Sequence, residues 1–190
     1  HKLNMGASFT YDSYKEIVNN TPSSTEELVP GIFGQYTYTN NDIFTLIAGI
    51  RYDNHNLFGH FVTPRLHLKY KPAEKITVRA SVGKGYRSPH IYAENNYILM
   101  TSRNIILEEK LKAEEAWNMG GSIVYDFELF GQTSDFSIEF YRTVFSNQIV
   151  FDQDMNPQEV HIYNLRGESY SNSAQAVFNT EIMTALTLTA

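Results

Sequence analysis

The segment from Thr63 to Pro89 constrains the fold most strongly, because two alternating strands follow one another across a short turn. Apolar residues recur at every second position, and charged or small polar residues stand between them. The apolar set is Leu66, Leu68, Tyr70, Ile76, Val78, Ala80 and Val82, and the polar set is Arg65, His67, Lys69, Lys71, Thr77, Arg79, Ser81 and Gly83. Period-two alternation predicts an antiparallel hairpin with one apolar and one polar face.

The same pattern recurs along most of the chain. Besides the hairpin, strands are expected over about 3–14, 31–39, 43–53, 117–127, 135–151 and 169–182, and another begins at residue 185. Short turns near residues 40, 72, 130 and 184 alternate with longer connections over 15–28, 86–115 and 152–157, although the connection at 54–61 is short. This alternation is typical of an outer-membrane barrel. We therefore expect an all-β, antiparallel up-and-down meander of about eight strands from a larger transmembrane β-barrel, with a short helix near 108–117.

Composition narrows the functional classes. No apolar run reaches the length of a membrane-spanning helix, and the net charge of −6 argues against nucleic acid as a partner. The absence of cysteine excludes disulfides and thiolate metal sites. Six histidines are scattered without metal-ligand spacing, and the acidic pairs in the loops lack the spacing of a calcium loop, so solvated side chains are the favoured interpretation. No catalytic motif is present, and we expect neither an enzyme, nor a metal, nor a cofactor.

Three segments resemble one family. Pro64-Arg65-Leu66 and the closing Gly85-Tyr86-Arg87-Ser88-Pro89 are similar to a hairpin of TonB-dependent outer-membrane receptors. Leu111-Lys112-Ala113-Glu114 resembles the segment that leads from a large outer loop back into the barrel, and Tyr163-Asn164-Leu165-Arg166-Gly167 is a weaker match. Gly120, Ser122, Ser173 and Gln175 depart from the family pattern.

The resemblance implies energised uptake of a scarce nutrient across the outer membrane of a Gram-negative bacterium. The nutrient would be an iron-siderophore, haem or a corrinoid such as vitamin B12. Residues 1–190 would then be a barrel piece truncated at both ends, taken from a family architecture of about 22 strands. Its implied partners are its own plug domain, the TonB complex, outer-membrane lipid and the small-molecule nutrient.

Two groups of side chains are candidates for function. The long extracellular loop, about 86–116, mixes aromatic, amide and basic residues suited to a polar ligand. These ligand-binding candidates are Tyr86, Arg87, Tyr92, Asn95, Tyr97 and Arg103, and packing between loops is an equally plausible role for them. The basic residues at the polar positions of the alternating strands would face the lumen and its plug, because charge on a lipid-facing surface is costly. They include Arg51, Arg65, His67, Lys69 and Arg79.

Two other classes remain open from the sequence. A soluble all-β module that binds carbohydrate would pack the apolar faces of two sheets together. A barrel enzyme would need serine, histidine and carboxylate grouped at one rim, and no such grouping is visible in the sequence. The basic or small polar residues opposite each apolar position favour one sheet between lipid and water.

Overall fold

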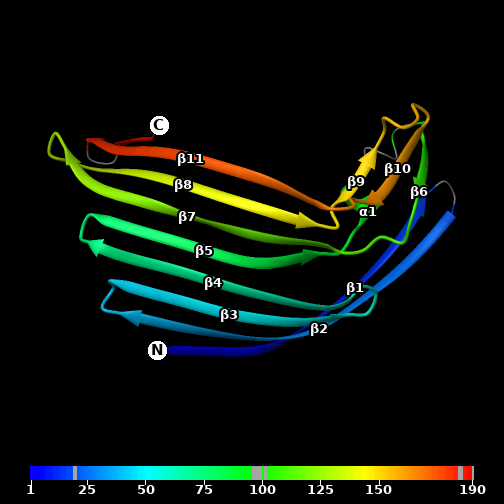
Figure 1. The fold of residues 1–190 in the computed structure, drawn as a ribbon, viewed down its shortest axis with the longest axis horizontal. Coiled ribbons are helices and arrows are strands. Elements are labelled where there is room, and N and C mark those ends of the chain that lie inside the picture. The colour runs from blue at the N-terminus through cyan, green and yellow to red at the C-terminus, as the bar shows by residue number, and fades with distance from the viewer. Residues whose placement is uncertain (19–20, 96–99, 101, 184–185, 190) are drawn as a thin grey trace.

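The computed structural model describes residues 1–18, 21–95, 100, 102–183 and 186–189. Within these residues, nine strands form one open antiparallel sheet in the order β1-β2-β3-β4-β5-β7-β8-β11-β12 (Figure 1). They are β1 (Lys2–Val18), β2 (Thr21–Asn40), β3 (Phe44–His55), β4 (Gly59–Ala73), β5 (Ile76–Arg87), β7 (Glu114–Leu129), β8 (Gln132–Ser146), β11 (Glu168–Met183) and β12 (Leu186–Thr189). The predicted all-β meander is confirmed, and the sheet does not close on itself.

The strand register sorts the side chains onto two faces. Leu46 lies opposite Leu68, and Leu66 lies opposite Val82, so the apolar positions continue from strand to strand. The same alternation places Lys69 opposite Arg79 on the other side. We call these two sides the apolar face and the polar face. The predicted grouping of apolar residues on one side and basic residues on the other is therefore confirmed for strands β3 to β5.

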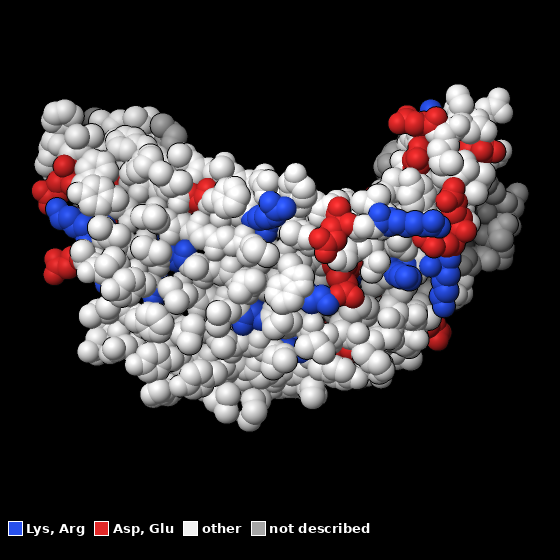
Figure 2. All heavy atoms as spheres, viewed as in Figure 1, with Lys and Arg blue, Asp and Glu red and all other residues white. Residues whose placement is uncertain are grey.

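The apolar face is uncovered. Met5 is 74% exposed, Phe9 67% and Ile138 53%, although all three are large apolar side chains. Figure 2 shows many charged side chains at the end that carries β6, β9 and β10, and others scattered among uncharged atoms over the rest of this view. A soluble sandwich would bury such a surface against a second sheet. An apolar surface of this extent instead requires an apolar environment or a partner.

A second, smaller sheet lies at the long-loop end (Figure 1). It contains β6 (Asn104–Leu107), β9 (Ile149–Asp152) and β10 (Glu159–Asn164), and β10 pairs in parallel with β6 and antiparallel with β9. We call it the outer sheet. Val160 and Ile162 alternate inwards with no exposed surface and pack with Leu111. The outer sheet therefore has a small core of its own.

Several sequence expectations were wrong in detail. Residues 15–18 and 21–28, expected to form part of a loop, are strand, because β1 and β2 pair from Lys2 opposite Thr37 to Val18 opposite Thr21. The helix expected near 108–117 is absent from these described residues, and β7 begins at Glu114 instead. The strand expected over 135–151 is divided between β8 and β9, which lie in different sheets.

Among the described residues, α-helix is confined to one turn. This turn is α1 (Ile91–Glu94), inside the long loop. No helix in the described part of the chain is long and apolar enough to cross a membrane.

Candidate functional site

A buried carboxylate brings together the ends of two strands and the start of the long loop. Glu27 of β2 is 5% exposed, and its Oε2 lies 3.5 Å from Nε2 of His55 at the end of β3. His90 Nε2 lies 3.7 Å from the same oxygen, and the Ser88 hydroxyl donates to it over 3.4 Å. We call these four residues the Glu27 cluster. Glu26-Glu27 is one of the acidic pairs expected to be solvated, and for Glu27 this was wrong, because Ser88 and His90 of the long loop pack against it.

The Glu27 cluster does contain the serine, histidine and carboxylate that a barrel enzyme would need. Ser88 Oγ lies 3.3 Å from Nε2 of His90, but Glu27 faces that same nitrogen. In a catalytic triad the acid holds the opposite ring nitrogen and thereby orients the imidazole. The arrangement therefore holds the loop against the strands and lacks the geometry of a triad. No group of three or more potential ligands in the described residues could hold a metal ion.

A cavity of about 380 Å³ adjoins the Glu27 cluster. Tyr14 and His90 lie on one part of its wall with their rings 4.6 Å apart, and Lys110 contributes a basic side chain. Leu57, Phe58, Ile91, Leu107 and Leu111 supply apolar surface. This combination of apolar walls with a few polar groups is typical of small-molecule sites.

A second polar network lies beside this cluster on β3. Arg51 Nε donates to Asp53 Oδ2 over 2.7 Å, and Arg51 Nη2 donates to the Ser8 hydroxyl on β1 over 2.7 Å. Asp53 is 2% exposed, so the arginine supplies the counter-charge that a buried carboxylate requires. Phe61 and Tyr86 stack with their ring centroids 3.8 Å apart and connect β4 to the end of β5.

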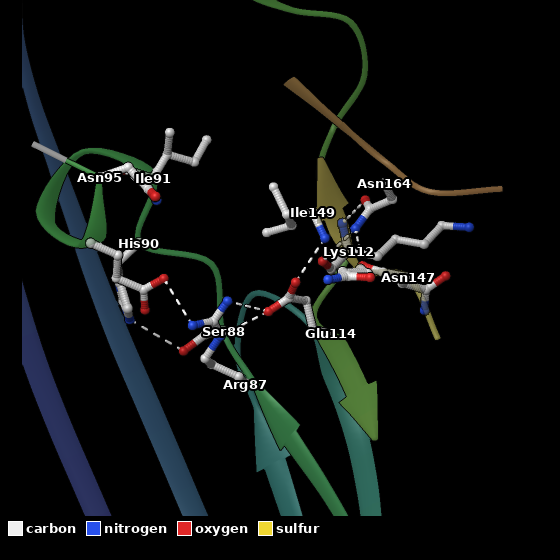
Figure 3. Close-up of polar contacts among 12 residues, drawn as sticks. Arg87, Ser88, His90, Ile91, Asn95, Lys112, Glu114, Asn147, Ile149 and Asn164 are labelled. Atoms are coloured by element: carbon white, nitrogen blue, oxygen red, sulfur yellow. Dashed lines mark hydrogen bonds and ion pairs between the residues drawn. The ribbon is translucent and has the colours of Figure 1, made fainter. Parts of the chain in front are cut away.

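Arg87 and Glu114 join the strand ends to the outer sheet (Figure 3). Arg87 Nε donates to Glu114 Oε2 over 2.8 Å, and Arg87 Nη1 lies 3.3 Å from Glu94 of α1. The other oxygen of Glu114 accepts the backbone N–H of Ile149 in β9 over 2.7 Å. One carboxylate thereby connects β5, β7 and β9.

Asn164 makes a second connection at the end of β10 (Figure 3). Its Oδ1 accepts the N–H of Lys112 over 2.8 Å, while its Nδ2 donates to the carbonyl oxygens of Asn147 at 2.6 Å and Lys112 at 3.2 Å. Asn164 is 6% exposed, and its amide is fully used. The Asn164 match to the family motif thus has a physical role, because it holds the segment before β7 against the outer sheet.

The structure does not gather the predicted loop residues into one group. Tyr86 and Arg87 lie at the strand end, whereas Arg103 donates to Gln153 beside the outer sheet. The Asn95 amide donates to the Ile91 carbonyl over 3.2 Å and closes α1. The side chain of Tyr92 and the whole of Tyr97 lie outside the described residues.

The predicted lumen-facing residues share the polar face but differ in their partners. Arg51 is paired with Asp53, and Arg65 Nη2 donates to Gln35 over 2.6 Å. His67, Lys69 and Arg79 line a cavity of about 180 Å³ together with Tyr141. Within the described residues, His67, Lys69 and Arg79 make no ion pair.

Known proteins share both sequence and fold with this chain. Residues 2–179 match the family described as TonB dependent receptor-like, beta-barrel. The ferric enterobactin receptor of Pseudomonas aeruginosa is 24% identical over 200 residues, which cover 90% of this chain and 26% of that protein. The ferrienterobactin receptor of Escherichia coli K12 is 26% identical over 118 residues, or 51% of this chain and 16% of that protein.

Solved structures show the same fold at lower identity. The siderophore receptor PirA from P. aeruginosa superposes with a TM-score of 0.76 at 17% identity, covering 98% of this chain and 37% of that one. A P. aeruginosa ferric enterobactin receptor in complex with BCV-L6 gives 0.74 at 16% identity, covering 98% of this chain and 32% of that one. The matched part of this chain thus spans between 16% and 37% of the length of these proteins. On the family match over residues 2–179, it belongs to the TonB-dependent receptor β-barrel family.

Proposed function

We propose that this chain is part of an outer-membrane receptor that takes up a ferric siderophore with energy supplied through TonB. The family match carries this proposal, and relatives named as ferric enterobactin receptors favour a siderophore over haem or a corrinoid. In such a receptor the apolar face contacts lipid, and the polar face looks into the lumen. The exposure of the large apolar side chains supports this orientation.

The polar face supports contact with a plug domain. His67, Lys69 and Arg79 lie together without a carboxylate partner among the described residues, whereas Arg51 and Arg65 are already occupied by Asp53 and Gln35. Carboxylates of the plug would complete the first group. We therefore expect Lys69→Gln or Arg79→Gln to weaken plug retention more than Arg65→Gln.

The ligand would approach from the long-loop end. The described loop candidates Tyr86, Arg87, Asn95 and Arg103 belong to this end, as does the cavity beside the Glu27 cluster. Tyr92 and Tyr97 join them in this proposal through their place in the sequence of the same loop. Aromatic side chains supply contact area at low entropy cost, while strand pairing is set elsewhere. Replacing Tyr92 and Tyr97 together with alanine should weaken ligand binding and leave barrel assembly intact.

Uptake by the full-length receptor tests the proposal. Cells that lack their own siderophore receptors would express it and receive radiolabelled ferric enterobactin, haem or cyanocobalamin. We expect iron uptake from ferric enterobactin that is lost when TonB is deleted. Uptake of haem or cyanocobalamin alone would contradict the siderophore assignment, and uptake unchanged without TonB would contradict energised transport.

A further inference from the structure

One arginine lies on the apolar face among side chains suited to lipid. Arg142 belongs to β8 and lies between Met119 of β7 and Asn172 of β11 in the strand register. The next apolar-face residues towards the short turns are Phe140 and Ile138, which are 52% and 53% exposed. A charged side chain therefore lies directly beside the apolar side chains of this face.

The surroundings of Arg142 show that it lies where the apolar side chains of the apolar face end. Arg142 lies ten residues after Gln132, where β8 begins at a short turn, and four before Ser146, where β8 ends near the long loops. At the next aligned positions on the same face, nearer those loops, the register places Lys84 opposite Trp117. Lys84 also forms an ion pair with Glu115. Aromatic residues at such a boundary are typical of the membrane interface.

The guanidinium of Arg142 is oriented but not neutralised. Its Cζ lies 4.3 Å from the ring centroid of Tyr170, which is itself 63% exposed. This cation–π contact places the charge over the ring and provides no hydrogen-bond acceptor in the plane of the guanidinium. In the described part of the chain, Arg142 has no carboxylate partner and no protein hydrogen bond, although Asn172 lies opposite it on β11.

An oriented, unpaired arginine at this depth fits an anionic partner from the bilayer. Arginine binds phosphate with paired N–H donors, and lipid headgroups place phosphate at the interface. The Asn172 amide and the Tyr170 hydroxyl are neutral donors on the same face of β11. Neighbouring Phe140 and Ile138 offer apolar surface along which the acyl chains of the same lipid can lie.

We propose that Arg142, Tyr170 and Asn172 bind the phosphate headgroup of a lipid in the leaflet nearest the long loops. This site rests on the membrane placement given under the proposed function and is independent of the transported nutrient. It holds a lipid by its headgroup at one position on the barrel, which a purely apolar surface does not do.

Binding of a soluble short-chain phosphatidic acid to the full-length receptor tests the site. The receptor would be purified in nonionic detergent, and binding would be followed by native mass spectrometry. Arg142→Gln should weaken binding about tenfold, because it removes a charge-assisted bidentate contact. Arg142→Lys should give an intermediate loss, and Tyr170→Leu should weaken binding more than Tyr170→Phe, which keeps the ring.

Matched controls separate the site from general charge effects. Arg166→Gln removes an exposed arginine from a turn near the long loops and should leave binding unchanged. Diacylglycerol with the same acyl chains should bind weakly in every variant. Equal binding by Arg142→Gln and its parent, or equal binding of diacylglycerol and phosphatidic acid, would overturn the proposal.

Two further measurements identify the source of the phosphate and isolate the membrane site from transport. If inorganic phosphate displaced the lipid at equal concentration, the site would be one for a free anion, and the lipid assignment would be wrong. Ferric enterobactin binding would be measured on the same preparations. Loss of that binding with phosphatidic acid still bound would contradict the proposed nutrient and leave the lipid site supported.

Discussion

The nine-stranded sheet and the outer sheet are stabilised in different ways. In the outer sheet, Val160 and Ile162 have no exposed surface and form a conventional core with Leu111. In the large sheet, apolar residues such as Ile138 and Phe140 are about half exposed. The large sheet therefore depends on its backbone ladder and on its surroundings, whereas the outer sheet carries its own hydrophobic stabilisation.

This difference assigns separate roles to the two regions. The ladder of the large sheet extends from β1 to β12 without relying on the long loops. The outer sheet is held to it by polar contacts, chiefly Glu114 to the Ile149 N–H and Asn164 to Lys112 and Asn147. We expect the outer sheet to open separately while the large sheet remains paired.

Removing the centre of the outer core should have the largest effect. Ile162→Ala leaves a cavity where the side chain is fully buried, and such changes cost about 2–5 kcal/mol. Hydrogen exchange of the full-length receptor should show faster exchange in β6, β9 and β10 alone. The matched change Ile138→Ala, on the exposed apolar face, should leave these strands protected; equal loss of protection in both variants would contradict the comparison.

A close approach between strands should make Gly121 one of the sensitive positions of the large sheet. A Cβ at this residue would lie 2.5 Å from the backbone oxygen of Arg79, so an added methyl group must separate β5 from β7. Gly121→Ala should cost up to about 3 kcal/mol of unfolding free energy in detergent. Gly85→Ala is the control, since nothing lies within 4 Å of its added Cβ. A Gly121→Ala receptor with unchanged urea unfolding would show that the ladder tolerates wider spacing.

Removing the Asn164 contacts should cost less free energy than either of these changes. Asn164→Asp replaces the donating amide nitrogen with an oxygen that faces the carbonyls of Asn147 and Lys112. A buried group left without its partner costs about 1–3 kcal/mol. Exchange should increase in the outer sheet and around residue 112. Asn179→Ala, which removes a contact to Asp135 within the large sheet, should not produce this pattern.

The large sheet was predictable because its order is local and repetitive. Alternation alone assigned Leu66 and Arg65 to opposite faces, and the register confirms it. The extension of β1 and β2 over residues 15–18 and 21–28 was not predictable, because these residues show no apolar alternation. Residues 108–117 have high helix propensity, but from Glu114 onwards the pairing of β7 with β5 overrides it.

The outer sheet and the Glu27 cluster depend on contacts between distant residues. β6 pairs in parallel with β10, more than fifty residues later, and neither strand was expected. Ser88 and Glu27 are 61 residues apart in the chain. The alternation of Val160 and Ile162 was a usable signal for β10. No spacing rule could have joined His55, His90 and Glu27.

The smallest expected effect is a pH dependence confined to the outer sheet. His161 on β10 lies 2.9 Å from Glu108 through Nδ1 and 3.2 Å from Glu159 through Nε2. The hydrogen bond with Glu108, and then that with Glu159, raise the pKa of His161 above its ordinary value of 6.5. A raised pKa in the folded state stabilises that state fully below the unfolded pKa. This stabilisation is lost as pH rises through the folded pKa.

The rate of backbone amide hydrogen exchange in β6 and β10, corrected for the intrinsic effect of pH, should therefore increase as pH rises from about 6 to 8. Asp152 also faces His161, but the Asp154 N–H lowers the pKa of its carboxyl, so Asp152 stays ionised throughout that interval. His161→Gln should remove the dependence while the large sheet remains unaffected in both proteins. A pH dependence that persisted in His161→Gln would place its origin elsewhere, and one that spread to β3 and β4 would contradict the separation of the two sheets.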